Sequence, residues 1–437
     1  MSKDKQKKKI YKPKPISGFP EWLPEYRVVE QQWMDKIRAV FESYGYCSIE
    51  TPSVEELEVI AAKGEDVDKE IYVLERLQAD SNDKKDARLA LHFDQTVPFA
   101  RYVGQHFNEL TFPFKRYQMQ RVWRGERPQL GRAREFYQCD IDVINVDSLP
   151  IHFDAEVAAI CYEAMDAMDI GRVQLRISNR KILMGLLAHI EIEDSVGVTR
   201  IIDKIEKIGS EEVARILKDD LNIPSDQIQE VLTLVQTKDI PSIKALNDEM
   251  QEGIDELSFV LNNLKHLPDH AIVADLSIVR GLDYYTGTVY ETRLLDIPEF
   301  TSSVCSGGRY DDLASNYINK KLPGVGISIG FTRLFEVLHH YNHIKAGKKS
   351  PADILMVLPS EKQRALASDT ARTLRNRGFK VEMYHAPQKI GKQFSYAEKK
   401  NIQYVWIPPF EEGNAHEVKN LDSKTQTEAD PNDWTIS

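Results

Sequence analysis

The chain has 437 residues, of which 42% are hydrophobic and 29% are charged, and its formal net charge is −11 at pH 7. This length allows about two to four domains with ample cores, and the composition is that of a globular protein. The acidic balance excludes nucleic-acid binding through a general basic field, so any such binding requires local basic patches.

Cysteine use and the N-terminus indicate the compartment. The four cysteines form no CxxC pair, which argues against a disulfide framework or a zinc site and favours a reduced, cytoplasmic protein. The sequence shows no signal peptide and no run of about 18 apolar residues, so we expect no membrane segment. Residues 1–16 are rich in lysine and predict a basic flexible tail, with a weak contact to an RNA backbone as the alternative.

The first ordered elements are a helix and a short strand. Apolar residues recur at three- and four-residue spacing between Trp22 and Tyr44, which predicts an amphipathic helix that ends at Gly45. A short strand follows and stops at Pro52, because proline cannot donate to a β-ladder. The helix, the strand and the edge proline together form a candidate dimer interface.

Residues 87–98 predict a second strand that runs into a turn at Asp94, Gln95 and Thr96, followed by a helix from Val97. Asp94 has two interpretations. It is either a turn-forming residue, which is the more common role of an isolated aspartate, or a ligand for a substrate ammonium group.

Residues 114–145 predict two strands joined by a basic loop, and they are the densest candidate site in the sequence. On the second strand Gln138, Asp140 and Asp142 alternate with apolar residues, so one face is polar and acidic while the other enters the core. Four arginines lie between positions 124 and 134, and guanidinium groups bind phosphate in a bidentate manner. The combination indicates a site for a nucleotide and a small cationic or amino-bearing substrate; the alternative, a solvated hairpin with a charged tip, does not explain the alternation.

Two later stretches are also candidates. Residues 277–291 contain Arg280 and Gly281 before Tyr284 and Tyr285, and glycine there permits close approach of a ligand, although a hairpin with core tyrosines is the alternative. Residues 303–334 contain a glycine pair without the spacing and lysine of a P-loop. They end in a strand and a helix whose first turn holds an arginine, a place that favours an anion.

The remaining segments predict the domain organisation. Residues 181–268 have helical periodicity and no catalytic constellation, so we expect a helical insertion. A linker at 344–350 precedes strands that alternate with helices, which predicts a small α/β domain with a largely parallel sheet. The polar residues after about 423 predict a mobile tail.

Taken in order, these segments resemble the class II aminoacyl-tRNA synthetases, and specifically the histidyl-tRNA synthetase family. The three class motifs correspond to the helix and strand ending at Pro52, the strand-loop-strand around residues 124–127, and residues 326–333. Residues 280–285 (RGLDYY) and 307–311 (GGRYD) are similar to the signatures of the histidyl members. The resemblance covers about residues 18–422.

The chain departs from the family pattern at two places. Thr332 stands before the motif 3 arginine, where an acidic residue is usual. Asp94-Gln95-Thr96 replaces the Glu-Gly-Thr of many bacterial members. Neither change removes a charge that the chemistry obviously requires.

The resemblance implies an α+β fold. The expected parts are a catalytic core with an antiparallel sheet flanked by helices over residues 17–180 and 269–343, the helical insertion over 181–268, and an anticodon-binding α/β domain with a polar tail over 351–437. It also implies a homodimer.

The resemblance further implies a histidine–tRNA ligase. L-histidine and ATP give histidyl-adenylate and pyrophosphate, and the histidyl group then passes to the 3′ end of tRNA-His. Magnesium is expected with ATP and not from a protein metal motif. The rival functions are a catalytically inactive regulatory paralogue, a class II enzyme for another amino acid, and an RNA-binding protein.

Roles on the nucleotide side follow from the resemblance. Arg124 is expected to bind the α-phosphate, Glu126 to orient adenine, and Arg333 to hold the γ-phosphate. Arg280 is expected to neutralise the α-phosphate as well, so that Arg124 and Arg280 are the catalytic pair. The carboxylate of the amino acid is itself the nucleophile, so no general base is needed.

Roles on the amino-acid and tRNA sides follow in the same way. The expected histidine-binding residues are Asp94, Thr96, Gln138, Asp142, Arg280, Tyr284, Tyr285 and Tyr310. The first three are expected to hold the ammonium and carboxylate groups, and the aspartate at 142 with the tyrosines to recognise the imidazole, because a ring with two nitrogens needs polar partners. Gln129 and Arg134 are expected to contact the acceptor end of the tRNA.

Overall fold

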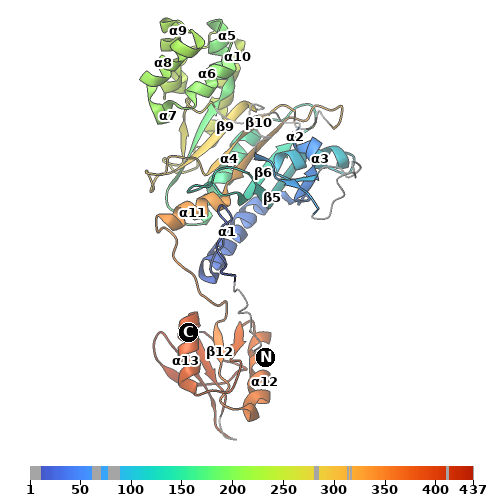
Figure 1. The fold of residues 1–437 in the computed structure, drawn as a ribbon, viewed down its shortest axis with the longest axis vertical. Helices are drawn as coiled ribbons and strands as arrows, with labels where there is room; N and C mark the ends of the chain where they lie inside the picture. Colours follow the sequence, from blue (N-terminus) through green and yellow to red (C-terminus); the bar gives the residue numbers. More distant parts are fainter. Residues whose placement is uncertain are drawn as a thin grey trace, which may run out of the picture. The chain divides into compact units, whose positions relative to one another are not determined.

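A computed structural model describes residues 11–61, 70–76, 89–279, 285–312, 314, 317–409 and 413–436 (Figure 1). The chain forms two compact units. One comprises Met1–Glu21 with Trp33–Ile344, and the other comprises Trp22–Gln32 with Lys345–Ser437.

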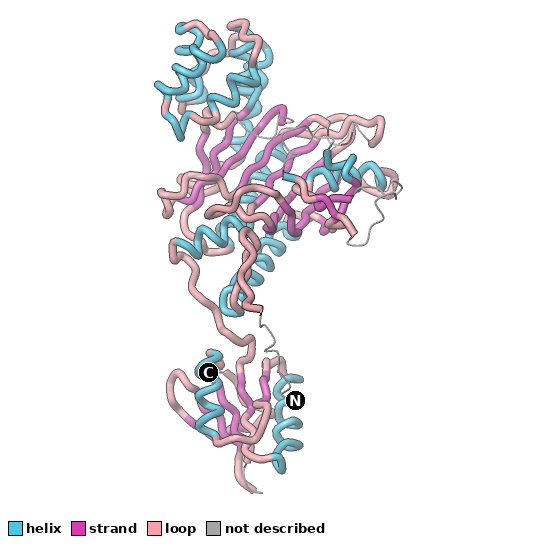
Figure 2. Tube along the Cα trace, viewed as in Figure 1, coloured by secondary structure: helices cyan, strands magenta, loops and turns pink. Residues whose placement is uncertain are grey.

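An eight-stranded sheet is the centre of the first unit, and its strands are magenta in Figure 2. In spatial order the strands are β1 (Cys47–Ser48), β5 (Phe114–Trp123), β6 (Glu135–Ile144), β11 (Gly324–Ile329), β10 (Cys305–Tyr310), β9 (Tyr285–Leu294), β7 (Val173–Asn179) and β8 (Ile272–Ala274). The five inner pairings are antiparallel, whereas the outermost pairings, β1 with β5 and β7 with β8, are parallel. The α+β class expected from the sequence is confirmed, with a sheet that is mixed at its edges.

Helices and a small second sheet surround these strands. The helices are α2 (Leu57–Ala61), α3 (Thr96–His106), α4 (His152–Ala167), α11 (Phe331–His340) and the part of α1 (Pro24–Ser43) from Trp33 onward, since the earlier part belongs to the second unit. The three-stranded sheet has the order β2 (Val54–Glu56), β4 (Leu89–Leu91), β3 (Val73–Leu74). Most residues of α4 are buried, which explains its nearly continuous apolar sequence, because a helix that is apolar all round is a buried one.

The strand, turn and following helix predicted from residue 87 onward are present, with a strand that is shorter than predicted and a helix that begins one residue before Val97. β4 covers only Leu89–Leu91 among the described residues, and α3 already begins at Thr96. The carboxylate of Asp94 accepts a hydrogen bond from the backbone N–H of Val97 at 3.0 Å, which satisfies a free donor of the first helical turn. Pro98 is compatible with that turn because its missing N–H would have no helical partner there.

The helical segment after β7 forms its own cluster, coloured green in Figure 1. Its members are α5 (Arg180–His189), α6 (Ser195–Ile202), α7 (Ile205–Ile208), α8 (Ser210–Leu221), α9 (Ser225–Gln236), the 3-10 turn η2 (Ile240–Ser242) and α10 (Asp248–Asn263). α5 and α10 approach closely through glycines: a Cβ at Gly253 would lie 2.9 Å from the backbone nitrogen of Ile182. A larger residue at this position would push the two helices apart.

The second unit has a five-stranded sheet. Its strands, in spatial order, are β13 (Val381–Met383), β12 (Ile354–Met356), β14 (Tyr404–Ile407), β15 (His416–Asn420) and β16 (Gln426–Ala429), and its helical segments are η3 (Glu361–Gln363), α12 (Arg364–Asn376) and α13 (Ile390–Lys400). The first three strands are parallel and the last two antiparallel, as the alternation of strands and helices predicts for the first part of this unit.

The mobile tail predicted after residue 423 is wrong. β16 pairs with β15, and the ring of Trp434 lies 5.6 Å from that of Trp406 and 5.2 Å from that of Phe379. The guanidinium of Arg377 donates to the carbonyl of Trp434 at 2.8 Å. The ring of Trp434 and the pairing of β16 therefore hold the segment after residue 423, although its polar composition predicts a mobile tail. Within the described residues, no helix has the length and apolar content needed to cross a membrane.

Candidate active site

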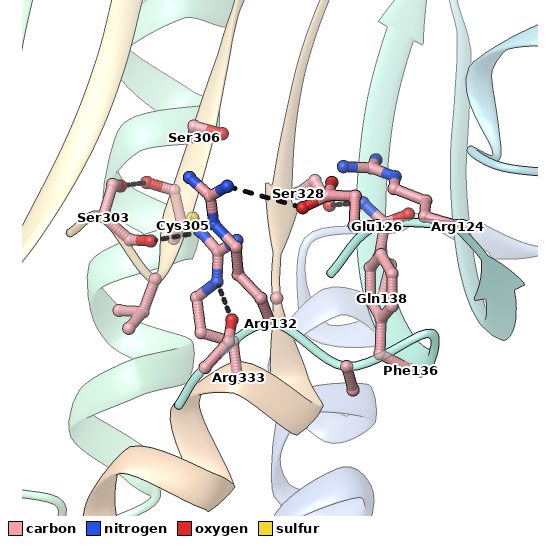
Figure 3. Close-up of a pocket in the computed structure, with 14 residues that line it drawn as sticks. Arg124, Glu126, Arg132, Phe136, Gln138, Ser303, Cys305, Ser306, Ser328 and Arg333 are labelled. Carbon is pink, nitrogen blue, oxygen red and sulfur yellow. Dashed lines mark hydrogen bonds and ion pairs between the residues drawn. The ribbon is translucent and has the colours of Figure 1, made fainter. Parts of the chain in front are cut away.

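A polar cavity of about 110 Å³ opens on the eight-stranded sheet where β6, β11 and β10 meet the start of α11 (Figure 3). Its lining residues are Arg124, Glu126, Gly131, Arg132, Ala133, Phe136, Gln138, Ser303, Val304, Cys305, Ser306, Ser328, Gly330 and Arg333. The cavity thus joins the strand-loop-strand segment to the last motif of the sequence, as the candidate site requires.

Arginines form one side of this cavity. Arg124 lies at the end of β5, where its Nε donates to the carbonyl of Phe93 at 3.0 Å and its guanidinium lies 5.2 Å from the centre of the Phe136 ring. Arg132 is 3.5 Å from the carboxylate of Glu126. These contacts hold the guanidinium groups over the cavity, as Figure 3 shows.

Arg333 completes the cationic side. Its Nε donates to the carbonyl of Gly131 at 2.6 Å and a terminal nitrogen donates to the carbonyl of Ser303 at 2.8 Å. Burial lowers the pKa of Arg333, and repulsion from Arg124 and Arg132 lowers it further. Three guanidinium groups that repel one another make the cavity a strong site for a polyanion such as a phosphate chain.

Thr332, which departs from the family pattern, has a visible structural role. Its hydroxyl accepts a hydrogen bond from the backbone N–H of Tyr137 at 2.8 Å and so fastens the first turn of α11 to β6. One turn later, burial raises the pKa of Glu336 to about 7, while a hydrogen bond with the backbone of Gly131 and the charge of Arg333 act in the opposite direction. Together these contacts fix the helix that carries Arg333.

Hydrogen-bond acceptors form the opposite side. Gln138 donates from Nε2 to the Ser328 hydroxyl at 2.7 Å, and Asp140 lies opposite Ser328 in the β6–β11 register. Asp140 is buried, and this burial raises its pKa to about 7, although the charge of Arg116 and a hydrogen bond from Ser328 lower it. The alternation predicted for β6 therefore places Gln138 in the cavity wall and buries Asp140 two residues further along the same face.

Asp142 lies one step further along the same face. Its Oδ2 is 2.5 Å from a terminal nitrogen of Arg116, and its Oδ1 accepts a hydrogen bond from the Tyr310 hydroxyl at 3.0 Å. Arg116 is fully buried and lies 4.3 Å from the centre of the Phe99 ring. A Cβ at Gly326 would lie 2.0 Å from Asp142 Oδ1, so only glycine leaves room for this carboxylate.

The structure brings some of the other expected histidine-binding residues near this pair. Tyr285 opens β9 and lies opposite Tyr310 in the β9–β10 register. Asp94 is buried and supports the first turn of α3, at which Thr96 is the first residue. The expected roles of Arg280 and Tyr284 fall outside the described residues.

The two residues expected to contact tRNA have different surroundings. Gln129 is exposed at the loop tip, where its backbone pairs with that of Arg132 and Gly131 adopts a φ of +72°. Arg134 is partly buried at the base, where its Nε donates to the carbonyl of Glu126 and its backbone N–H to that of Gly18. Arg134 therefore supports the loop from within.

Sequence reasoning did not single out Arg132, Ser306, Ser328 or Arg116 as site residues. Ser306, Ser328 and Asp140 lie in register across neighbouring strands, and this pairing is visible only in the folded sheet. The alternation of Ser328 with apolar residues in motif 3 is the one sequence signal that could have found it.

Comparisons with known proteins agree on one family. Residues 18–334 match the family model "Histidyl-tRNA synthetase", and residues 353–434 match the model "Anticodon binding domain". The histidine–tRNA ligase of Thermobifida fusca is 53% identical over 98% of this chain and 99% of its own length, and that of Micrococcus luteus is 45% identical over 96% and 95%.

Solved structures agree with these matches. The crystal structure of histidyl-tRNA synthetase from Nostoc sp. PCC 7120 superposes with a TM-score of 0.87 at 37% identity, covering 96% of this chain and 97% of that one. A Bacillus halodurans structure described as an ATP phosphoribosyltransferase regulatory subunit/histidyl-tRNA synthetase has a TM-score of 0.73 at 20% identity, covering 89% of this chain and 97% of that one. This second likeness shows a shared fold alone.

Proposed function

The chain belongs to the histidyl-tRNA synthetase family, and we propose that the cavity between β6, β10 and α11 is where it joins L-histidine to ATP. The activity is that of a histidine–tRNA ligase, an ATP-dependent aminoacyl-tRNA synthetase. The observation that carries the site assignment is the bipolar cavity, with arginines on one side and acceptor groups on the other. A regulatory subunit that performs no phosphate chemistry has no need of this arrangement.

The arginine side suits the triphosphate. Arg124 would bind the α-phosphate and Arg333 the γ-phosphate, since both guanidinium groups are held by backbone carbonyls before any ligand arrives. Cations fixed in this way stabilise the negative charge that develops at the α-phosphorus, without reorganisation during the reaction. Glu126, which lines the same cavity, would orient the adenine. Arg280, the second expected catalytic cation, lies outside the described residues.

Magnesium would enter with ATP. Among the described residues, no group of three or more histidine, cysteine, aspartate or glutamate side chains is placed to hold a metal ion. Mg²⁺ usually keeps several waters and binds through substrate phosphates and one or two carboxylates. The substrate phosphates and waters would therefore supply the magnesium ligands, and Glu126 would keep its contact with the adenine.

The acceptor side suits histidine. Asp142, held between Arg116 and the Tyr310 hydroxyl, would accept a hydrogen bond from the imidazole, with Tyr285 beside it. Asp94, Thr96 and Gln138 would hold the ammonium and carboxylate groups. The substrate carboxylate then attacks the α-phosphorus and pyrophosphate leaves, so the protein acts by positioning and charge neutralisation.

The other parts of the chain would serve the tRNA. The second unit, which matches an anticodon-binding domain, would recognise tRNA-His, while Gln129 at the exposed loop tip would contact its acceptor end. We further propose a homodimer that works in the cytoplasm. β1 is an edge strand with an exposed pair of residues, and such an edge is free to join a second subunit.

Exchange of labelled pyrophosphate into ATP tests the proposal. The purified chain with magnesium and ATP should catalyse exchange when histidine is present, and not with any other standard amino acid. Exchange with a different amino acid would reassign the specificity within the class. Binding of histidine without exchange would instead favour a regulatory role, and absence of both would reject the site.

A further inference from the structure

Buried oxygens in this site lack hydrogen-bond donors. In the part of the chain that the structure describes, Oε1 of Gln95, Oε1 of Gln138 and Oδ1 of Asp140 have no hydrogen-bond partner, although these side chains are at most 9% exposed. Buried polar groups in native proteins are almost always paired. Several unpaired acceptors in one place therefore indicate that a ligand supplies the donors.

Hydrogen bonds link the three side chains to one another. Gln95 donates from Nε2 to the backbone carbonyl of Gln138 at 3.1 Å. Gln138 donates to the Ser328 hydroxyl at 2.7 Å, and Ser328 also hydrogen-bonds to Asp140. Gln138 and Ser328 line the cavity, and Asp140 pairs with Ser328 in the register of β6 and β11. The unpaired acceptors therefore belong to one corner of the site.

Charge at this corner is unbalanced. The groups that act on Asp140 are Arg116 on β5, Asp142 on β6, Asp94 before α3 and Ser328 on β11. Arg116 forms an ion pair with Asp142 at 2.5 Å, and its Nε lacks a hydrogen-bond acceptor among the described residues. One buried guanidinium thus faces more than one carboxyl group and donates to few of their oxygens. A small cation that carries several N–H donors would balance the remaining carboxyl charge and pair the free acceptor oxygens.

We propose that Asp140, acting with Gln138, binds the α-ammonium group of the amino-acid substrate. The inference rests on the proposed function, since it takes histidine as the substrate, and it adds Asp140 to the residues expected to hold the ammonium group. Within the described residues, Gln95, Gln138 and Asp140 each offer one unpaired acceptor oxygen, and an ammonium group has three N–H donors to pair with them. Asp142, by contrast, is already bound by Arg116 and Tyr310.

The buried position of Asp140 makes the binding of histidine depend on pH. Its pKa is raised to about 7, chiefly by burial, so near neutral pH the carboxyl is partly protonated before the ligand binds. A bound ammonium group favours the ionised carboxylate. Binding of histidine below pH 7 should therefore release a proton from Asp140.

A pair of ligands isolates the ammonium contact. L-histidine and 3-(imidazol-4-yl)propionate share the ring and the carboxylate, but the second compound has no ammonium group. Wild-type enzyme should bind histidine about 10- to 100-fold more tightly than the analogue, as expected for a charge-assisted contact. In Asp140→Asn this ratio should fall by about fivefold or more, with the affinity for ATP unchanged.

Asp142→Asn is the matched control, because it alters the neighbouring carboxylate on the same strand. It should weaken the binding of both ligands and leave their ratio unchanged. If Asp142→Asn weakens neither ligand, the proposed imidazole contact fails while the Asp140 result still stands. If Asp140→Asn leaves the ratio unchanged, whether or not both ligands bind more weakly, the ammonium role of Asp140 is overturned.

A measurement on the wild-type chain does not depend on how the variants fold. Calorimetry at pH 6.5 in buffers of different ionisation enthalpy counts the protons released on binding. Histidine should release more protons than the analogue, after the ring protonation of each free ligand is allowed for. Equal proton release by the two ligands would contradict the proposal.

Discussion

The buried pair of Arg116 and Asp142 combines a structural ion pair with the role that we propose for Asp142 in binding histidine. The guanidinium has no access to solvent, and its partner carboxylate also accepts a hydrogen bond from Tyr310. Removing one member of such a pair leaves a buried charge uncompensated. A variant at Asp142 must therefore be judged by which substrate it affects, and not by loss of activity alone.

We expect Asp142→Asn to raise the KM for histidine by about tenfold or more, as for loss of a charged hydrogen bond, and to change the KM for ATP by less than about twofold. The reason is that Asp142 lies on the acceptor side, where it pairs with Arg116, and is not among the residues that line the cavity with Arg124 and Arg333. Steady-state pyrophosphate exchange, with each substrate varied in turn, measures both constants. An equal rise in both would mean that the ion pair supports the whole fold.

The raised pKa of Asp140 predicts a pH-dependent penalty on stability. Between about pH 4 and pH 7 the unfolded chain has released this proton while the folded chain still holds it, so the folded state loses stability as the pH rises through that window. Each pKa unit of difference corresponds to about 1.4 kcal/mol. Above pH 7 the penalty stays constant, because both states are then ionised.

Asp140→Asn removes this titration. The variant should therefore gain free energy of unfolding relative to the wild type as the pH is raised from 5 to 8. Urea denaturation of the ligand-free proteins at the two pH values measures the difference, and other titrating groups cancel between the two chains. A difference that does not change with pH would show that burial does not shift this carboxyl.

Residue-level reasoning from the sequence found the polar face of β6 but could not assign its members different tasks. Period-two alternation places Gln138, Asp140 and Asp142 on one face. The split between a carboxylate paired with Arg116 and one without such a partner depends on cross-strand register, which joins residues far apart in the chain. No local pattern in a single sequence contains that information.

At the scale of elements, the loop between β5 and β6 separates two functions. Gln129 is exposed at the tip, while Arg134 is fixed to the carbonyl of Glu126 at the base. The side chain of Gln129 can therefore be changed without removing a cavity residue, whereas its neighbours Gly131 and Arg132 line the cavity.

Gln129→Ala should leave pyrophosphate exchange within about twofold of wild type and lower the rate of histidine transfer to tRNA by roughly tenfold, as for loss of one good contact. Arg134→Ala, made in parallel, should lower both rates, because it releases the backbone beside Glu126. Single-turnover transfer from preformed adenylate separates the two steps. Equal loss of both rates in Gln129→Ala would place the tip in the nucleotide site instead.

The sequence predicted the element types well where a periodic pattern was long. The paired strands β5 and β6 and the helical cluster α5–α10 all follow from such patterns. It failed for short elements whose ends depend on tertiary contacts. β4 is shorter than the predicted strand, and α3 begins one residue earlier than predicted, with Asp94 supporting its first turn. β16 was missed because it forms on the edge of β15, with Trp434 anchoring the chain beyond it.

At the scale of the whole molecule, the two units contain separate sets of working parts. Every residue that lines the cavity lies between Arg124 and Arg333. The second unit has its own sheet and its own core, in which Trp406 is fully buried. The family matches divide in the same way, at residues 334 and 353. Histidine activation and tRNA recognition should therefore respond differently to loss of the second unit.

A chain that ends at Ser350 should test this separation. It should keep histidine-dependent pyrophosphate exchange within about threefold of the full chain, because no cavity residue is removed. Its rate of tRNA-His charging should fall by about 100-fold or more, which corresponds to a loss of about 2.7 kcal/mol or more of tRNA-binding free energy. Raising the tRNA concentration should restore part of the charging rate, since recognition and not chemistry has been lost. Thermal unfolding of the shortened chain controls for general damage. Loss of exchange in a chain that still unfolds cooperatively would show that the second unit supports the chemistry of the first.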